Sequence, residues 1–312
     1  MPRACSAVIY LKYKNNNSTN FALSEVKMLF VCPKCKEQLN IAENGSAFCQ
    51  NGHSYDRSRK GYYNLFLTNK GGVHGDNKMM VEARRAFLDG DFYKPLAVGI
   101  AEKVKAYAKK GGAVLDIGCG EGYYTDYVEK ALSARDGASN VYGFDISKDA
   151  VARAIRRNPK MNIAVAGAYD MPIASESVDV AINLFAPLAL TETHRILKPD
   201  GHFIMAIPGV EHLFGLKELL YKNPYKNTVN EPELEGFELV SSTPVSYKLM
   251  LNRNDDIRNL FRMTPYAYRT PEDACKLIEE LPYLETSIDF IIFVYKKQQS
   301  TAFFGEMPRV YI

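Results

Sequence analysis

The sequence lacks long apolar runs, and no stretch approaches the roughly 18 consecutive apolar residues that a membrane-spanning helix requires. It has little net charge, because 39 Lys and Arg stand against 36 Asp and Glu. A site for a polyanion therefore has to come from local clustering of basic residues. The short apolar run at residues 7–11 lacks the small-residue cleavage site of a secretory signal. These absences argue against a membrane protein and predict no membrane partner.

Cysteine is scarce and unevenly spread. Three of the six cysteines lie within 18 positions, from Cys32 to Cys49, and the others occur singly. This is not a disulfide framework, so we expect a reducing, cytoplasmic location. The 312 residues are 46% apolar and 24% charged and show no internal repeat, which suits one large globular domain with a small one and excludes collagen, coiled coil and wholesale disorder.

Composition divides the chain into four parts. Residues 1–27 carry the polar tract 15–20 and no useful periodicity, which predicts a disordered extension. Because the ordered pattern begins at Met28, an alternative is that translation starts there. We expect a small metal-binding and RNA-recognition domain at 28–72, a large domain at 73–297 and a flexible tail at 298–312.

The large domain alternates strand-like and helix-like segments, which predicts an α/β fold with a mainly parallel sheet. Two helical segments at 79–88 and 95–109 come first. Past Gly236 two longer strands flank a helix and suit an antiparallel pair at the sheet edge, giving seven strands in all. The predicted strands are 113–117, 141–145, 163–166, 178–184, 202–207, 237–251 and 287–295, and the late helix is 272–281.

A glycine-rich turn follows the first of these strands. Strand 113–117 runs into Gly118-x-Gly120-x-Gly122, and a helix-compatible segment comes next. Glycine permits the tight turn and lets a ligand approach the backbone closely. Asp145, 27 residues beyond Gly118, ends the second strand, where a carboxylate can accept hydrogen bonds from both ribose hydroxyls. The pattern predicts a nucleoside-containing ligand.

Two carboxylates at this turn, Asp116 and Glu121, separate two classes of ligand. They would repel the pyrophosphate of a dinucleotide, whereas S-adenosylmethionine carries a sulfonium and an ammonium group and no phosphate. The dinucleotide fingerprint also places its third glycine three residues after the second. The residues therefore favour S-adenosylmethionine; a dinucleotide site and a strand-turn-helix without a ligand are the alternatives.

A cluster of thiols and one imidazole has the spacing of a metal site. The pattern Cys32-x2-Cys35-x13-Cys49-x3-His53 supplies four ligands from two short loops, which suits tetrahedral zinc. Four protein ligands leave no open position, so the zinc should be structural and substitute for a core. Asn44-Gly45 and Asn51-Gly52 predict two short hairpins around it. Free thiols and a redox pair are the alternatives.

The segment after the cluster is basic and rich in tyrosine. Between residues 54 and 70, four basic residues accompany one acidic residue, Asp56. Cations neutralise phosphates and tyrosine rings stack on unpaired bases, so the segment predicts contact with single-stranded RNA. The alternative is a solvated loop whose aromatic rings pack on the large domain. The predicted RNA-binding residues are Arg57, Arg59, Lys60, Tyr62, Tyr63 and Lys70.

Residues 93–296 resemble the class I S-adenosylmethionine-dependent methyltransferases, which have a Rossmann-like fold. Asp116 to Gly122 match their first motif and Asp145 their second. The resemblance implies that the loop around Asp170 lies near the adenine and that Asn183, at the end of the fourth strand, lies at the transfer site.

From Cys32 to Tyr295 the chain is similar to a narrower family, the RlmA-type 23S ribosomal RNA guanine-N1 methyltransferases. This resemblance implies a zinc module that grips an RNA hairpin, zinc on the four residues named above, and cofactor contacts at Tyr93, Gly120, Glu121, Asp145 and His212. The motifs that carry it are His53-Ser-Tyr-Asp56, Gly61-Tyr-Tyr-Asn-Leu65, Glu82-Ala-Arg-Arg-Ala-Phe-Leu88, Tyr93-Lys-Pro-Leu96, Pro208-Gly-x-x-His-Leu213 and Met263-Thr-Pro-Tyr266.

The expected activity is methylation of N1 of a guanine in a domain II hairpin loop of 23S rRNA, with a homodimer left open. The alternatives are a small-molecule methyltransferase with a structural zinc knuckle and a non-catalytic RNA-binding module. An Asn-Pro-Pro-Tyr motif, the mark of many exocyclic-amine methyltransferases, is absent, which favours an endocyclic nitrogen. The group that removes the N1 proton is not identified; the candidates are Glu82, Asn183, His194 and His212.

Overall fold

The computed structural model describes residues 28–67, 78–268 and 270–299. The predicted extension 1–27, most of the predicted tail and Lys70 lie outside these ranges. The helices are α1 (Lys78–Asp89), α2 (Lys94–Tyr107), α3 (Tyr123–Asp136), α4 (Lys148–Arg157), α5 (Leu190–Ile196), α6 (Phe214–Leu220), α7 (Asn254–Arg262) and α8 (Glu272–Glu280), with short 3-10 turns η1 (Ala168–Asp170) and η2 (Pro265–Tyr268). Among the described residues, none of these helices is long and apolar enough to cross a bilayer.

The strands form two sheets. β1 (Asn40–Ile41), β2 (Ala47–Phe48) and β3 (Ser54–Tyr55) make a small antiparallel sheet. The large sheet has the order β10-β11-β9-β8-β5-β6-β7-β4 and is parallel from β4 to β9, with β11 and β10 antiparallel at the other edge. Its strands are β4 (Tyr63–Asn64), β5 (Val114–Ile117), β6 (Val141–Asp145), β7 (Asn162–Val165), β8 (Val178–Leu184), β9 (Leu197–Pro208), β10 (Phe237–Leu251) and β11 (Leu284–Lys297).

The predicted α/β architecture is confirmed, and the sheet gains one strand. The seven expected strands are present, and β4 adds an eighth because Tyr63 and Asn64 pair in parallel with Ala164 and Val165 of β7. The backbone N–H of Leu65 also donates to the Val165 carbonyl at 2.8 Å. The sequence pattern did not predict β4, because a strand of two residues is too short to show an alternating pattern.

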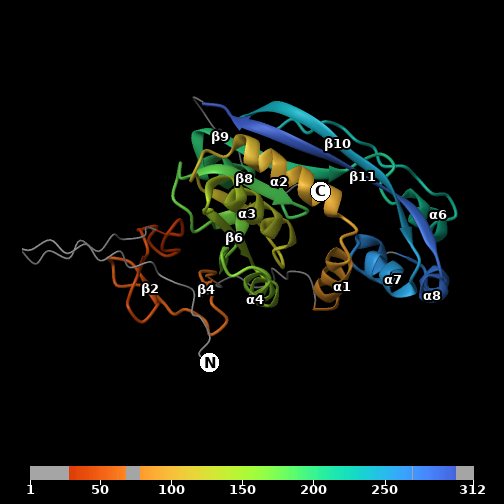
Figure 1. Ribbon diagram of the computed structural model, residues 1–312, viewed down its shortest axis with the longest axis horizontal. Helices are drawn as coiled ribbons and strands as arrows, with labels where there is room; N and C mark the ends of the chain where they lie inside the picture. Colours follow the sequence, from red (N-terminus) through yellow and green to blue (C-terminus); the bar gives the residue numbers. More distant parts are fainter. Residues whose placement is uncertain (1–27, 68–77, 269, 300–312) are drawn as a thin grey trace, which may run out of the picture.

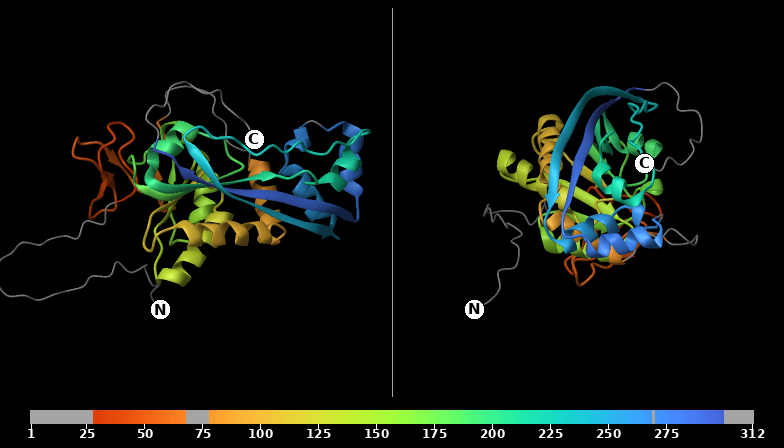
Figure 2. Two further views of the ribbon diagram at one scale, coloured as in Figure 1. Left: turned by 90° about the horizontal axis from the view of Figure 1, so that it is seen from above. Right: turned by 90° about the vertical axis from the view of Figure 1, so that its right-hand side faces the viewer.

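The two faces of the large sheet have different covers (Figures 1 and 2). Val114 and Val180 of the sheet share a core cluster with buried residues of α2 and α3. Leu115 and Phe144 share a second cluster with α5 and the zinc-bearing residues 28–67. Successive strand residues point to opposite faces, so one short strand serves both layers.

The zinc-bearing segment is attached to the sheet by apolar packing and backbone bonds. The Phe30 ring is buried and meets the Tyr142 ring edge-on, with centroids 5.6 Å apart. The Val31 N–H donates to the Pro172 carbonyl at 2.8 Å. The expected hairpins at Asn44-Gly45 and Asn51-Gly52 are confirmed by the β1–β2 and β2–β3 pairings. The segment thus has little core of its own and shares that of the large sheet.

The opposite end of the molecule is built on two long strands. β10 and β11 extend past the rest of the sheet, and α6, α7 and α8 lie at their far end (Figure 1). α1 packs against α7 and so joins this end. The zinc-bearing segment and these helices therefore lie at opposite ends of the molecule (Figure 2).

Candidate functional site

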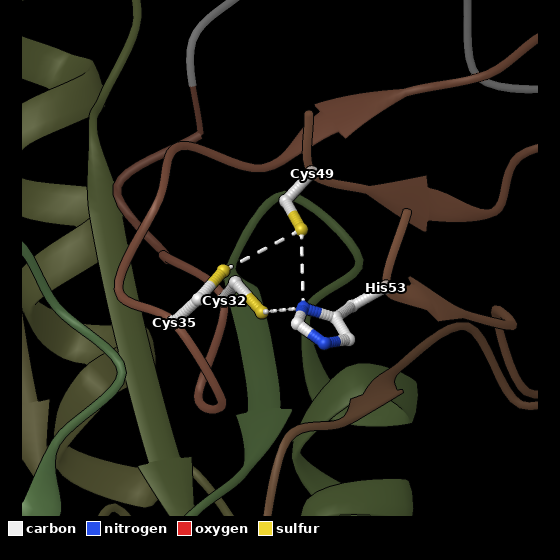
Figure 3. A group of neighbouring side chains, drawn as sticks. All are labelled: Cys32, Cys35, Cys49 and His53. Atoms are coloured by element: carbon white, nitrogen blue, oxygen red, sulfur yellow. Dashed lines mark hydrogen bonds between the residues drawn. The ribbon is translucent and has the colours of Figure 1, made fainter. Parts of the chain in front are cut away.

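The four predicted metal ligands converge from two loops (Figure 3). Their ligand atoms all lie within 4.8 Å of one another. His53 Nδ1 is 3.5 Å from Cys32 Sγ and 3.4 Å from Cys49 Sγ, and the Cys35 and Cys49 sulfurs are 3.6 Å apart. The loops turn through left-handed residues, Lys36 at φ 61° and Gly52 at φ 77°. Two tight knuckles thus present the ligands to one point.

The three shortest of these separations, 3.4, 3.5 and 3.6 Å, match the donor set of a zinc site. With Zn–S near 2.3 Å and Zn–N near 2.0 Å, a tetrahedron places neighbouring ligand atoms roughly 3.5–3.8 Å apart. The Tyr55 hydroxyl lies 3.1 Å from Cys32 Sγ and can donate to it, which steadies a thiolate as outer partners of zinc ligands do. Zinc would be held by Cys32, Cys35, Cys49 and His53 through Nδ1, in a closed structural site.

The predicted glycine turn forms between β5 and α3. Gly118, Gly120 and Gly122 have φ of 74°, 54° and 78°, where a Cβ is disfavoured. A Cβ on Gly118 would lie 2.5 Å from the Ala186 Cβ, so this glycine is required by close packing. A Cβ on Gly120 would meet nothing within 4 Å, so this position borders open space that a ligand can enter.

Asp145, at the end of β6, is fixed beside this turn. Its Oδ2 accepts from the Gly120 N–H at 3.1 Å and its Oδ1 from the Ser147 N–H at 2.8 Å. A carboxylate has about four acceptor sites and can accept from several donors at once. The loop and the carboxylate are therefore held in one arrangement.

A cavity of about 670 Å³ opens over the turn at the carboxyl ends of β5, β6, β7 and β8. The zinc-bearing segment forms part of its wall through Pro33 and residues 65–67, and α1 adds Val81, Arg84 and Leu88. Ligands of open α/β sheets bind at this edge. The remaining lining residues used below are Gly118, Gly120, Glu121, Tyr124, Asp145, Tyr169, Asp170, Phe185 and Ala186.

The two carboxylates at the turn differ in their surroundings. Glu121 is 4% exposed, its Oε1 accepts from Arg157 Nη2 at 3.0 Å, and burial raises its pKa. Its buried Oε2 accepts no hydrogen bond from any residue in the described ranges. Asp116 lies under the turn and outside the cavity lining, where its Oδ2 accepts from Thr125 Oγ1 at 2.6 Å. Burial raises the pKa of Asp116 to about 7.

Four other predicted cofactor residues, Tyr93, Gly122, Asn183 and His212, lie outside the cavity lining. Gly122 packs against Ala154. Tyr93 and His212 are buried together around Phe290, whose ring centroid is 5.2 Å and 4.2 Å from theirs. Asn183 is buried, and its Nδ2 donates to the Pro187 carbonyl at 3.2 Å. By contrast, Asp170 lines the cavity and forms an ion pair with Lys36 of the zinc-bearing segment.

The structure narrows the search for a proton acceptor. The Asp289 backbone N–H donates to His212 Nδ1 at 3.3 Å, so the remaining proton of a neutral imidazole is on Nε2. Burial lowers the pKa of His212 to about 3, which keeps the ring neutral. His212 then offers a donor and not a base. Glu82, Asn183 and His194 are also absent from the cavity lining.

The predicted RNA-binding residues fall into two groups. Arg57, Arg59 and Lys60 are exposed, as a phosphate contact requires. Tyr63 is buried and its hydroxyl donates to the Gly45 carbonyl at 2.7 Å, so no ring face is left for a base. Tyr62 packs partly buried against the cluster that includes α4. For these two tyrosines the geometry supports packing, the alternative weighed above.

Sequence reasoning missed several cavity residues. Phe185 follows the predicted strand 178–184, and Tyr124 and Tyr169 lie close to matched motifs, but none of the three was assigned a role. Arg84 belongs to the matched segment Glu82–Leu88 but was not predicted as a site residue, and it lines the cavity. Pro33 and residues 65–67 were missed because their approach to the turn depends on docking of the zinc-bearing segment.

Comparisons with known proteins agree with this geometry. The model described as "Methyltransferase domain" matches residues 115–205, and the one described as "RlmA, N-terminal" matches residues 30–70. The 23S rRNA (guanine(748)-N(1))-methyltransferase of Streptomyces fradiae is 31% identical over 259 residues, covering 80% of this chain and 90% of the relative. YxjB of Bacillus subtilis, provisionally named a 23S rRNA (guanine-N(1)-)-methyltransferase, is 30% identical over 283 residues, covering 86% and 97%.

Proposed function

Because the chain belongs to the family of 23S rRNA guanine-N1 methyltransferases, we propose that it transfers a methyl group from S-adenosylmethionine to N1 of a guanine in 23S rRNA. The observation that carries the proposal is the Asp145 carboxylate, fixed by two backbone amides beside the open space at Gly120. An acceptor for a ribose diol lies there at the bottom of a cavity large enough for a nucleoside.

The cofactor's contacts follow from the donors and acceptors in the cavity. We assign the ribose hydroxyls to Asp145 and the ammonium group to Glu121. Glu121 Oε2 is buried and lacks a hydrogen bond within the described ranges, and its ion-pair partner Arg85 is 4.0 Å away. Gly120 lets the ligand approach the backbone, Gly118 and Gly122 hold the turn in place by close packing, and Asp170 borders the adenine end. Tyr93, Asn183 and His212 act from behind the lining by supporting the residues that form it. When bound, S-adenosylmethionine supplies an electrophilic methyl group on sulfur.

The chain's task is to hold the target nitrogen in line with that methyl group and to exclude competing nucleophiles. The zinc-bearing residues 28–72 form the RNA-recognition part in this proposal, and residues 73–297 form the transfer part. Arg57, Arg59 and Lys60 would contact phosphates. We propose a hairpin loop of domain II as the substrate, because its unpaired bases can be turned outward. Such a substrate implies work in the cytoplasm, where ribosomal RNA is assembled.

The experiment uses the purified full chain with labelled S-adenosylmethionine and a 23S rRNA transcript. Digestion to nucleosides should yield N1-methylguanosine, and reverse transcriptase should stop one nucleotide before the site because N1 methylation blocks the Watson–Crick edge. N7-methylguanosine or 2′-O-methylated nucleosides alone would contradict the chemistry. Transfer to a small metabolite without an RNA product would support the small-molecule alternative.

A further inference from the structure

Phe185 lies one residue past β8, and its properties do not suit a packing residue. It is 46% exposed although its side chain is large and apolar. Its backbone φ is 61°, in the left-handed region that bulky L-residues avoid. It lines the cavity at the edge where the glycine turn lies. Exposure and backbone strain both act against stability, and strain of this kind concentrates at functional sites.

The turn that carries Phe185 is closed and locked to the glycine loop. Asn183 Nδ2 donates to the Pro187 carbonyl at 3.2 Å and so bridges the turn. Ala186 packs tightly on Gly118, because a Cβ added to Gly118 would lie 2.5 Å from the Cβ of Ala186. The position of Phe185 is thereby fixed relative to the loop that we assign to the cofactor.

Two rings hold the phenyl group of Phe185 in place. Its centroid is 5.5 Å from that of Phe290 and 6.2 Å from that of Tyr124, both in tilted contacts. Tilted ring contacts at these distances are attractive. The ring is therefore pre-organised, and its exposed part faces a ligand without first having to be ordered.

Strand order separates Phe185 from the nucleoside end of the cavity. In the order β8-β5-β6-β7, Asp145 ends β6 and the exposed ring of Tyr169 follows β7. Phe185 directly follows β8, which lies on the other side of β5 and its glycine turn. In the proposed function the cofactor's ribose binds Asp145 and its adenine lies toward Tyr169. The side of the cavity at β8 is then left for the RNA base that accepts the methyl group.

From these observations we infer that Phe185 is the platform on which the target base stacks during methyl transfer, an inference that rests on the proposed function. The phenyl ring offers a π-face and no hydrogen bond, so it binds the flat face of an unpaired base and leaves the base edge to other groups. Arg84 is the one cation among the cavity residues in the described ranges, and it can face the electronegative edge of a guanine.

The test compares three variants of the full chain on a 23S rRNA transcript. Phe185→Gly removes the ring and relieves the left-handed strain, Phe185→Tyr keeps the ring, and Tyr283→Ala removes an exposed aromatic ring that is 41% accessible and outside the cavity. The readouts are kcat/KM for RNA, S-adenosylmethionine affinity by calorimetry, and melting temperature.

Phe185→Gly should lower kcat/KM for RNA by about 5- to 150-fold, as expected for loss of one base stack, with cofactor affinity and melting temperature nearly unchanged. Phe185→Tyr and Tyr283→Ala should stay near wild type. Undiminished transfer by Phe185→Gly would overturn the inference while leaving the proposed function intact. A parallel fall in cofactor affinity would place the ring in the cofactor site and also overturn it. If the wild-type chain forms no N1-methylguanosine, the proposed function itself is overturned.

Discussion

Asp116 is a buried carboxyl group whose protonation links stability to pH. It is 3% exposed, it accepts from Thr125 Oγ1, and burial raises its pKa from 3.8 to about 7, with the nearby Asp145 charge adding to the rise. Between these two pH values the folded chain keeps a proton that the unfolded chain has released. The contribution of Asp116 to the free energy of unfolding therefore falls as pH rises from about 4 to about 7 and then levels off.

Asp116→Asn should remove this dependence, because an amide does not titrate. In urea unfolding of the cofactor-free chain at pH 5 and pH 8, the variant should gain stability relative to wild type on going to pH 8, by an amount on the order of 2–4 kcal/mol. Equal differences between variant and wild type at the two pH values would contradict this. The other titratable groups are shared by both chains and cancel in the comparison.

At the scale of elements, the glycines of the turn between β5 and α3 have two roles: some are needed for packing and one is needed to leave space for a ligand. All three glycines have positive φ, but only Gly118 and Gly122 have neighbours that a Cβ would strike, Ala186 and Ala154. Gly120 borders the cavity. The same loop therefore needs glycine for two different physical reasons.

Gly118→Ala and Gly120→Ala form a matched pair that tests this division. Both introduce the left-handed strain of an L-residue, which costs roughly 1–2 kcal/mol. Gly118→Ala adds the clash with Ala186 and should lose clearly more stability in thermal unfolding. Gly120→Ala should stay folded but bind S-adenosylmethionine more weakly in calorimetry, since its Cβ enters ligand space. Equal stability of the two variants would contradict this, because it would show that Ala186 moves away from the new Cβ at position 118 without loss of stability.

Some element boundaries were predictable and others were not, since β9 begins at Leu197 and not at residue 202, and β11 begins at Leu284 and not at residue 287. The predicted span of β10 is the observed one, and α8 ends one residue earlier than expected. Their patterns are local, because alternation and helical periodicity depend on residues close in the chain. β4 could not be predicted, since its two residues form a strand only where β7 offers an edge.

At the scale of the whole molecule, the zinc centre and the cofactor cavity are coupled by packing. Zinc orders two loops, and the same segment supplies Pro33 and residues 65–67 to the cavity wall. Lys36, directly after the zinc ligand Cys35, pairs with Asp170 in that wall. Loss of the metal should therefore disturb a site that contains no zinc ligand.

Removing zinc with a chelator, or by Cys49→Ser, should weaken S-adenosylmethionine binding several-fold as well as unfold the small sheet, because the wall loses its support. Cys275→Ser is the control, since Cys275 lies outside the zinc cluster and its Sγ donates to the Thr270 carbonyl at 3.7 Å. Zinc content, calorimetry and circular dichroism report the three quantities. Cofactor affinity that survives complete zinc loss would show that the two parts are stabilised independently.

The sequence by itself determined the features that local spacing encodes. The four zinc ligands lie within 22 positions, and the strand, glycine turn and Asp145 follow one another in a single βαβ unit. Such patterns can be recognised without knowing the fold, because the chemistry requires those residue types at those separations.

Only the tertiary structure decided which other residues meet in the cavity. It brought Pro33, Arg84 and Phe185 beside the glycine turn, and it left Tyr93 and His212 behind the lining. It also turned the ring of Tyr63 into a core and away from solvent. These outcomes depend on how separately encoded segments dock on the two faces of one sheet, and packing shape between distant segments leaves no periodic trace in the chain.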